Sequence, residues 1–326
     1  MKIKEIGVLL ACVLGTTLIN NTLKAQKPNS PKGFKVIPLG VLGGLDESNL
    51  SAYMVGANGS DAFICLDAGT INAGLIKASQ NKLFADKTSS LIQQENIKAY
   101  FISHGHLDHL AGLILNSPND ISKPVYALPS VIDVLKNNYF TWKGWANFAN
   151  EGDKPALGKY QYQYLNAEQE IQVPNTGLKV TSYSLSHVSP YESTAFLVNN
   201  NNDYLLYFGD TGADTVEHSN KLMNVWTHIA PLIKSKQLKA IFIEVSFDNS
   251  LPDKSLFGHL NPKLLMEEMN KLYSIAGNNL KELTIAITHI KPCSNCTQNI
   301  QQQIEAGNNL GLKFIYPTQG QLIRFN

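Results

Sequence analysis

The stretch that decides the fold is Ser103-His104-Gly105-His106-Leu107-Asp108-His109, which directly follows the apolar run Ala99–Ile102. Histidine and aspartate are ligands that zinc-like divalent ions prefer, and a loop leaving a strand end can aim alternate side chains inward. His104 and His106 lie two residues apart, so both can face one ion. Asp108 and His109 follow at once and can turn toward a second ion. Because an open catalytic site takes about three protein ligands per ion, four ligands here predict two metals.

Three further candidate ligands each follow an apolar run that reads as a strand. They are His187 after residues 179–185, Asp210 after residues 204–209, and His289 after residues 283–288. Sheet ends are where α/β proteins gather ligands, so these residues together with the loop at 103–109 predict one shared metal site. His218 and His228 lie in polar or helical sequence, and we assign them no role.

The body of the chain alternates between short β-rich runs and longer helical runs. Strands are expected at 34–38, 51–55, 62–66, 99–102, 125–128, 179–185, 193–198, 204–208, 240–244, 283–287 and 322–324. Helices are expected at 75–83, 108–115, 131–137, 223–229, 262–275 and 297–307. Strands at both ends with helices between them predict two α/β halves, with sheets packed face to face and helices outside, in a single domain.

The first 25 residues have the layout of a secretory signal peptide. Lys2 and Lys4 precede the apolar run Ile6–Ile19, and cleavage is expected after Ala25. The apolar run is too short for a membrane span, and we expect no lipid at Cys12. Residues 26–32 then form a linker and residues 33–326 the folded domain, so we expect an exported, periplasmic or secreted protein.

The net charge and the low content of charged residues argue against a polynucleotide as the substrate. The chain of 326 residues has a net charge of +1, and the first 25 residues carry three lysines and one glutamate, which leaves the remainder near −1. Charged residues make up 16%, against roughly 25% in typical proteins. Nothing in this pattern forms a basic track for a polynucleotide, so a small substrate fits better.

The three cysteines left after removal of Cys12 are expected to have a structural role, because they lie in no thioredoxin-like redox setting. Cys293 and Cys296 can close a small disulfide in an oxidising compartment, and the sequence leaves open whether they do. Cys65, inside the run 62–66, is expected to be a buried strand residue.

The metal loop and its continuation resemble a known signature. His-Gly-His-Leu-Asp-His-Leu-Ala-Gly-Leu-Ile-Leu-Asn-Ser-Pro at residues 104–118 is similar to that of the class II cyclic-nucleotide phosphodiesterases. Segments at 66–70, 139–148, 244–247 and 257–260 agree, and Ala146, where the family would have proline, is a local departure. The resemblance implies a four-layer αββα sandwich of the metallo-β-lactamase type, with two metals at one edge.

The resemblance also implies a role for each ligand. One metal would be held by His104, His106 and His187, the other by Asp108, His109 and His289, with Asp210 between them. Asp67 would support the metal loop through hydrogen bonds without ligating a metal. Zinc is the expected ion, with manganese or iron as alternatives.

The expected reaction is hydrolysis of 3′,5′-cyclic nucleotides, cAMP or cGMP, to 5′-nucleotides by a metal-bridged hydroxide. The leaving alkoxide needs a proton, for which His259 is the candidate donor, and Glu244 would orient it. Most aromatic rings between Tyr139 and Tyr164 are expected in the core, and none is assigned to base stacking.

Two alternatives remain open on sequence alone. The first is another hydrolase of this fold, acting on a lactam, a lactone, a sulfate ester or another phosphodiester such as RNA ends. The second is a catalytically dead scaffold that only binds a nucleotide. The complete set of predicted ligands disfavours the second alternative. The sequence leaves base preference and oligomeric state undecided.

Overall fold

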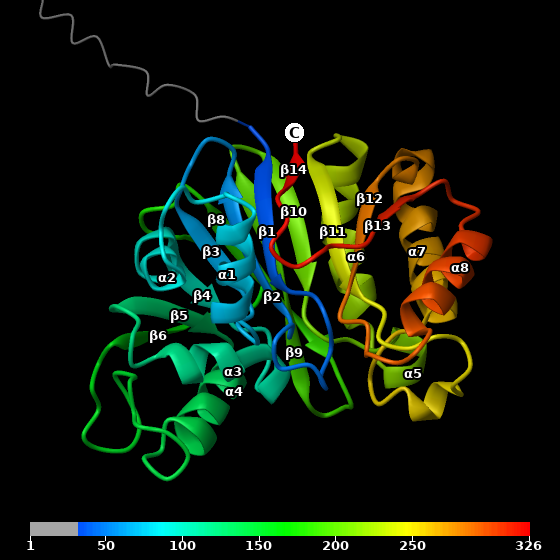
Figure 1. Cartoon of the computed structure of the whole chain (residues 1–326). Coiled ribbons are helices and arrows are strands. Elements are labelled where there is room, and N and C mark those ends of the chain that lie inside the picture. Colours follow the sequence, from blue (N-terminus) through cyan, green and yellow to red (C-terminus); the bar gives the residue numbers. More distant parts are fainter. Residues whose placement is uncertain (1–31) are drawn as a thin grey trace, which may run out of the picture.

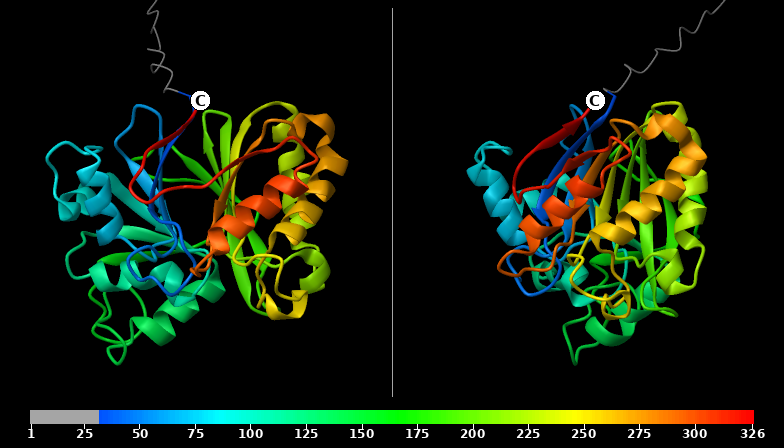
Figure 2. Two further views of the ribbon diagram at one scale, coloured as in Figure 1. Left: turned by 45° about the vertical axis from the view of Figure 1, so that its right-hand side comes forward. Right: turned by 90° about the vertical axis from the view of Figure 1, so that its right-hand side faces the viewer.

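The computed structural model describes residues 32–326, so the signal peptide expected at 1–25 lies outside the described residues. Two seven-stranded sheets pack face to face, and helices cover both outer surfaces (Figure 1, Figure 2). This is the four-layer αββα sandwich that the sequence predicts. None of the helices within residues 32–326 combines the length and the apolar character that crossing a membrane requires.

The first sheet is built from the N-terminal half of the chain and closed by its last strand. In spatial order its strands are β14 (Ile323–Phe325), β1 (Phe34–Gly40), β2 (Ala52–Ala57), β3 (Phe63–Leu66), β4 (Ile97–Phe101), β5 (Lys123–Ala127) and β6 (Tyr160–Tyr164). From β3 to β6 the strands run parallel. The helices of this half are α1 (Asn72–Gln80), α2 (Ser89–Asn96), α3 (Leu107–Asn116) and α4 (Pro129–Val134).

The second sheet repeats this plan. Its strands are, in spatial order, β13 (Lys313–Ile315), β12 (Thr284–Thr288), β11 (Leu238–Glu244), β10 (Asp203–Phe208), β9 (Glu192–Asn200), β8 (Lys179–Ser186) and β7 (Glu170–Gln172). From β10 to β13 the strands run parallel. Its helices are α5 (Asp214–Glu217), α6 (Lys221–Lys234), α7 (Pro262–Ala276) and α8 (Cys296–Gly307).

Aromatic rings fill the space between the two sheets. Tyr53 of β2 lies 5.5 Å from both Tyr207 of β10 and Phe242 of β11, and Phe101 of β4 lies 5.5 Å from Phe196 of β9, all between ring centroids. All five residues are buried. Removing one such side chain from water stabilises the fold by roughly 1.5–3 kcal/mol, so these contacts fix how the sheets face each other.

The eleven predicted strands are confirmed, with ends shifted by at most two residues, but several short elements were missed. The strands β6, β7 and β13 and the helices α2 and α5 do not appear in the sequence prediction. Strand β7 is a short, largely exposed edge strand with little hydrophobic signal. The predicted end of α6 at Ile229 is wrong, because Ile229 and Ile233 stay buried on one face and carry the helix past Pro231.

Candidate metal centre

All the predicted ligands meet at one edge of the sandwich, where strands of both sheets end. Because β3 and β4 are parallel, Asp67 and the loop at 103–109 leave the first sheet side by side. In the second sheet β10, β11 and β12 are parallel, so Asp210 and His289 emerge at the same end. Strand β9 is antiparallel to both neighbours, which brings His187 after β8 to that end too.

The first cluster of donor atoms joins three imidazoles and one carboxylate. His106 Nδ1 lies 3.1 Å from His104 Nε2 and 3.3 Å from His187 Nε2. Asp210 Oδ2 lies 3.6 Å from His104 Nε2 and 3.9 Å from His187 Nε2. Four ligands about 2.1 Å from a tetrahedral ion stand about 3.4 Å apart, so these separations match a zinc-type site.

The second cluster lies on the other side of the same carboxylate. His289 Nε2 is 3.2 Å from Asp108 Oδ2 and 3.3 Å from Asp210 Oδ2. His109 Nε2 is 3.2 Å from Asp210 Oδ1. Asp108 and His109 occupy the first turn of α3, which begins directly after His106. Asp210 therefore faces both clusters, as a bridging ligand would.

Two buried atoms at the centre of these clusters support the fit to metal ions. His109 Nε2 and Asp210 Oδ1 are fully buried and have no hydrogen-bond partner within residues 32–326. A buried polar atom without a partner is costly, so such atoms call for an explanation. The imidazole and carboxylate donors around them are those that zinc-like ions take. The residues present therefore fit divalent metal ions.

Asp67 supports this arrangement through hydrogen bonds, although it is not a member of either cluster. Its carboxylate accepts hydrogen bonds from Ser103 N at 2.7 Å, Ser103 Oγ at 2.8 Å and the Tyr207 hydroxyl at 2.7 Å. The fourth contact is His109 Nδ1 at 2.7 Å. That contact turns His109 Nε2 toward Asp210. Such outer carboxylates fix the orientation of a ligating ring and raise its basicity.

Two other ligands are oriented by residues that the sequence prediction missed. His187 Nδ1 lies 2.8 Å from the Gly258 carbonyl, and His289 Nδ1 lies 2.9 Å from Ser246 Oγ. The Ser246 hydroxyl donates to Glu244 Oε2 at 2.6 Å. Both partners lie in segments that agree with the family signature, at 244–247 and 257–260, but nothing in the sequence shows which ligand each of them contacts.

The electrostatics prepare the imidazoles for metal binding. Burial lowers the pKa of His104 well below its usual value, and burial also lowers that of His187. Burial, aided by the charge of His187, lowers the pKa of His106 to about 4. These rings are therefore neutral at neutral pH, which is the form that ligates a metal.

The region around His109 instead favours positive charge. Burial opposes a charge on His109, but the Asp210 and Asp67 carboxylates outweigh it and raise the pKa of His109 well above its usual value. Burial would likewise raise the pKa of Asp210, yet His109 and His289 hold it well below its usual range. A carboxylate that stays ionised in the interior between two groups of nitrogens is a suitable partner for cations.

His259 lies against the clusters, and the carboxylate of Glu244 is its hydrogen-bond partner. Its Nδ1 is 2.8 Å from Glu244 Oε1 and 3.8 Å from Asp210 Oδ2, and its ring is stacked on His289 with centroids 5.2 Å apart. Burial lowers the pKa of His259, but Glu244 outweighs it and the net shift is upward. With Nδ1 turned to Glu244, Nε2 is the nitrogen left for a ligand.

The backbone at the site is held in conformations that side chains rarely adopt. Asp67 and His289 have φ values of 54° and 58°, and Val188, next to His187, has 53°. Backbone also packs closely against one of these residues, since a Cβ on Gly43 would come within 2.4 Å of the His289 ring. Left-handed backbone at non-glycine residues concentrates at functional sites, which agrees with the clustering of ligands here.

Aromatic residues divide between the core and the edge of the site. Phe140 and Tyr160 are buried, whereas Tyr139 lines a surface pocket of about 280 Å³ with Leu107 and Trp145. Tyr139 also donates a hydrogen bond to the Gly105 carbonyl at 3.1 Å, so this pocket adjoins the metal loop.

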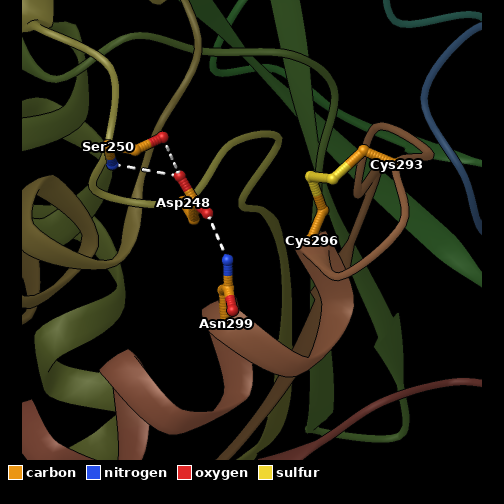
Figure 3. Close-up of a disulfide and its surroundings, with 5 residues drawn as sticks. All are labelled: Asp248, Ser250, Cys293, Cys296 and Asn299. Atoms are coloured by element: carbon orange, nitrogen blue, oxygen red, sulfur yellow. Dashed lines mark hydrogen bonds between the residues drawn. A yellow bond between two sulfur atoms is a disulfide. The ribbon is translucent and has the colours of Figure 1, made fainter.

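The remaining histidines and cysteines lie apart from the clusters. His228 is on α6, where Nδ1 contacts the Asn224 carbonyl at 2.9 Å, and His218 ends α5. Cys293 and Cys296 form a disulfide at the start of α8 (Figure 3), which settles the pairing that the sequence left open. Cys65 is buried in β3, as predicted.

The four-layer sandwich with His and Asp clusters at one edge defines a protein of the metallo-β-lactamase fold. Solved structures agree. The chain is similar to unliganded yeast PDE1, with a TM-score of 0.79, 21% identity and coverage of 90% of this chain and 99% of that one. It is also similar to the metallo-β-lactamase fold protein YhfI from Bacillus subtilis, with a TM-score of 0.60, 15% identity and coverage of 90% and 100%.

Sequence relatives identify the family. The model of the class-II cAMP phosphodiesterases matches residues 32–320. A 3′,5′-cyclic-nucleotide phosphodiesterase of Aliivibrio fischeri is 40% identical over 306 residues, covering 90% of this chain and 93% of that protein. A probable enzyme of the same description from Yersinia pestis is 39% identical over 312 residues, covering 91% and 90%. The chain belongs to the class-II cAMP phosphodiesterase family.

Proposed function

We propose that this chain hydrolyses 3′,5′-cyclic nucleotides, with cAMP as the reference substrate, to 5′-nucleotides by means of two divalent ions. The observation that carries the proposal is the buried carboxylate of Asp210, which faces one cluster of imidazoles on each side. Membership of the family supports the substrate class. We take zinc as the working identity of both ions, because imidazole and carboxylate donors suit it.

Each group of residues has a task in this proposal. His104, His106 and His187 would hold one ion and Asp108, His109 and His289 the other, with Asp210 shared. When bound, such a pair of ions supplies a hydroxide nucleophile at neutral pH and neutralises the negative charge of a phosphodiester. Asp67, Ser246 and the Gly258 carbonyl would keep the imidazoles oriented.

The protein must also supply a proton to the leaving group. Hydrolysis to a 5′-nucleotide forms a bond from the hydroxide oxygen to phosphorus and breaks the bond between phosphorus and the 3′ oxygen. That oxygen leaves as an alkoxide and needs a proton. His259 Nε2 would donate it, while Glu244 holds Nδ1 and favours the protonated ring.

We further infer that the protein is exported and loses its first 25 residues. The support is the sequence pattern of a positive start, an apolar run and Ala25 before Gln26. Mass spectrometry of the intact protein recovered from the periplasm or the medium tests this, and a mass that includes residues 1–25 contradicts it.

Product analysis is the experiment that tests the proposed reaction. The purified protein is incubated with 3′,5′-cAMP before and after metal removal by a chelator, with His228→Ala as a surface control. We expect chelator-sensitive release of 5′-AMP, equal in the control variant. Absence of hydrolysis by the metal-loaded protein would overturn the substrate assignment, and release of 3′-AMP would overturn the assignment of the bond cleaved.

A further inference from the structure

A lysine that the sequence analysis did not single out lies at the entrance to the metal centre. Lys291 is two residues after His289, on the segment that leaves β12. Its backbone N–H donates to the Ser246 carbonyl at 3.0 Å, while Gly43 N donates to the Ile290 carbonyl at 3.2 Å. The backbone of Lys291 is therefore fixed between two segments that also contact His289.

The position of the ammonium group follows from the space beside Gly44. A Cβ on Gly44 would stand 3.7 Å from Lys291 Nζ and 3.8 Å from Asp108 Oδ2, so both polar atoms face the same small space. The charge of Lys291 also opposes the Glu244 and Asp210 carboxylates in setting the pKa of His259. Lys291 Nζ thus lies near Asp108 and within electrostatic range of His259.

This ammonium group differs from those of the other partly buried lysines within residues 32–326, each of which has a carboxylate or a carbonyl as its partner. Within residues 32–326, Lys291 Nζ forms no hydrogen bond and no ion pair, although the residue is half-buried. Other partly or fully buried lysines are paired: Lys123 with Asp120 at 2.7 Å, and Lys271 with Glu268 at 2.6 Å. A cation withdrawn in part from water gains most from a partner anion, which here must come from outside the chain.

The disulfide and its neighbours restrain the backbone of the segment that carries Lys291. Cys293 and Cys296 close a loop directly after Lys291, and the following helix is held by Asn299, whose side chain donates to Asp248 at 2.7 Å (Figure 3). A lysine on a braced segment loses less conformational freedom on binding than one on a free loop, so its bond to an anion is stronger.

We propose that Lys291 binds a non-bridging phosphate oxygen of the substrate and of the 5′-phosphate product. This inference rests on the proposed function and adds a binding group that belongs to neither set of metal ligands. The substrate carries one negative charge at its phosphate and none on its base or ribose, so charge complementarity selects the phosphate. Asp108 does not compete for the lysine, since its Oδ2 faces His289.

Two variants of Lys291 and one matched control test the proposal. Lys291→Met keeps a similar length without the charge, Lys291→Arg keeps the charge, and Lys281→Met removes the same charge at an exposed position elsewhere. The measurements are calorimetric binding of 5′-AMP and of inorganic phosphate to the metal-loaded protein, KM and kcat for cAMP, and metal content.

We expect Lys291→Met to weaken 5′-AMP binding and raise the KM for cAMP by about ten- to a hundredfold, the range for a hydrogen bond to a charged group. Lys291→Arg should recover most of this loss, and Lys281→Met should match the wild type with metal content unchanged throughout. Wild-type binding by Lys291→Met, an equal loss in Lys291→Arg, or loss of metal would each overturn the proposal. Because 5′-AMP binding needs no turnover, this test stands apart from that of the proposed reaction.

Discussion

His109 Nε2 and Asp210 Oδ1 face each other at 3.2 Å in the interior and form no hydrogen bond, nor does either atom bond elsewhere within residues 32–326. Their other contacts explain the geometry. His109 Nδ1 is taken by Asp67, and Asp210 Oδ2 faces His104 and His289. A single divalent ion placed against both atoms could be coordinated by the imidazole nitrogen and by the carboxylate oxygen at once.

Metal removal is expected to destabilise the protein as well as to stop hydrolysis. Ions that bind only the folded chain stabilise it by about 4 kcal/mol when present at about a thousand times their Kd. Without them, the charges of Asp108 and Asp210 remain close together in a partly closed site. Scanning calorimetry should therefore show a lower Tm after chelation, restored by added zinc. A chelator already saturated with zinc is the control, and an unchanged Tm after verified metal loss would contradict the expectation.

The support that Asp67 gives to the metal loop can be measured separately from catalysis. Asp67→Asn keeps the shape but removes the charge and replaces one of the two acceptor oxygens of a carboxylate with four contacts by an NH₂ donor. Loss of such an outer partner weakens metal affinity by about 10- to 100-fold. Competition with a chromophoric chelator measures this, and Asp86→Asn, at an exposed position, should leave affinity unchanged. Equal affinities in the two variants would rule out the supporting role.

His259 and Glu244 are expected to affect turnover without affecting metal content. His259→Ala should retain both ions and lose roughly 10²- to 10⁴-fold in kcat, since a positioned general acid contributes that much. Glu244→Gln should have a kcat between that of His259→Ala and that of the wild type, because it leaves the His259 ring in place but no longer favours the protonated form of that ring. Elemental analysis beside the kinetics separates the roles: a lost ion would make His259 a ligand, and unchanged kcat would remove it from the mechanism.

A buried ion pair far from the metal centre gives a test of the fold alone. Lys123, 3% exposed, pairs with Asp120 at 2.7 Å, and Asp120 also accepts from the hydroxyls of Tyr100 and Tyr160. Lys123→Met should lower the free energy of unfolding by about 3–5 kcal/mol, because it leaves a buried carboxylate without its cation. The double variant with Asp120→Asn should recover part of that loss in urea denaturation. If the double variant is less stable than Lys123→Met, the unpaired charge of Asp120 is not the cause of the destabilisation.

The sequence predicted the layers of the fold because hydrophobic runs and turn residues repeat clearly along the chain. It also placed the metal loop and the more distant His187, Asp210 and His289 at strand ends, and the structure brings these residues together. Parallel strand order accounts for this success, since it carries separate strand ends to one edge. The roles of the individual ligands stay predictions.

The sequence could not predict which residues form hydrogen bonds to the ligands and orient them. Ser246 and Gly258 lie in segments that agree with the family, but their contacts with His289 and His187 arise only from the folding of the chain. The contact of Tyr207 with Asp67 arises from the packing of the two sheets. Lys291 was equally hidden, because one lysine after a histidine carries no spacing signal. Strand β7 was missed because a short exposed edge lacks the alternation that marks a half-buried strand.

The pairing of the first and last strands has a practical consequence. Phe34 of β1 lies opposite Phe325 of β14, so the chain enters and leaves the domain at one place. Strand β1 then runs toward the ligands, since the Val41 carbonyl just beyond it accepts from His289 N at 2.9 Å. Entry and exit therefore lie at the end of the sandwich remote from the metal edge (Figure 1). A purification tag, a fusion partner or attachment to a solid support at the C-terminal end would leave substrate access open.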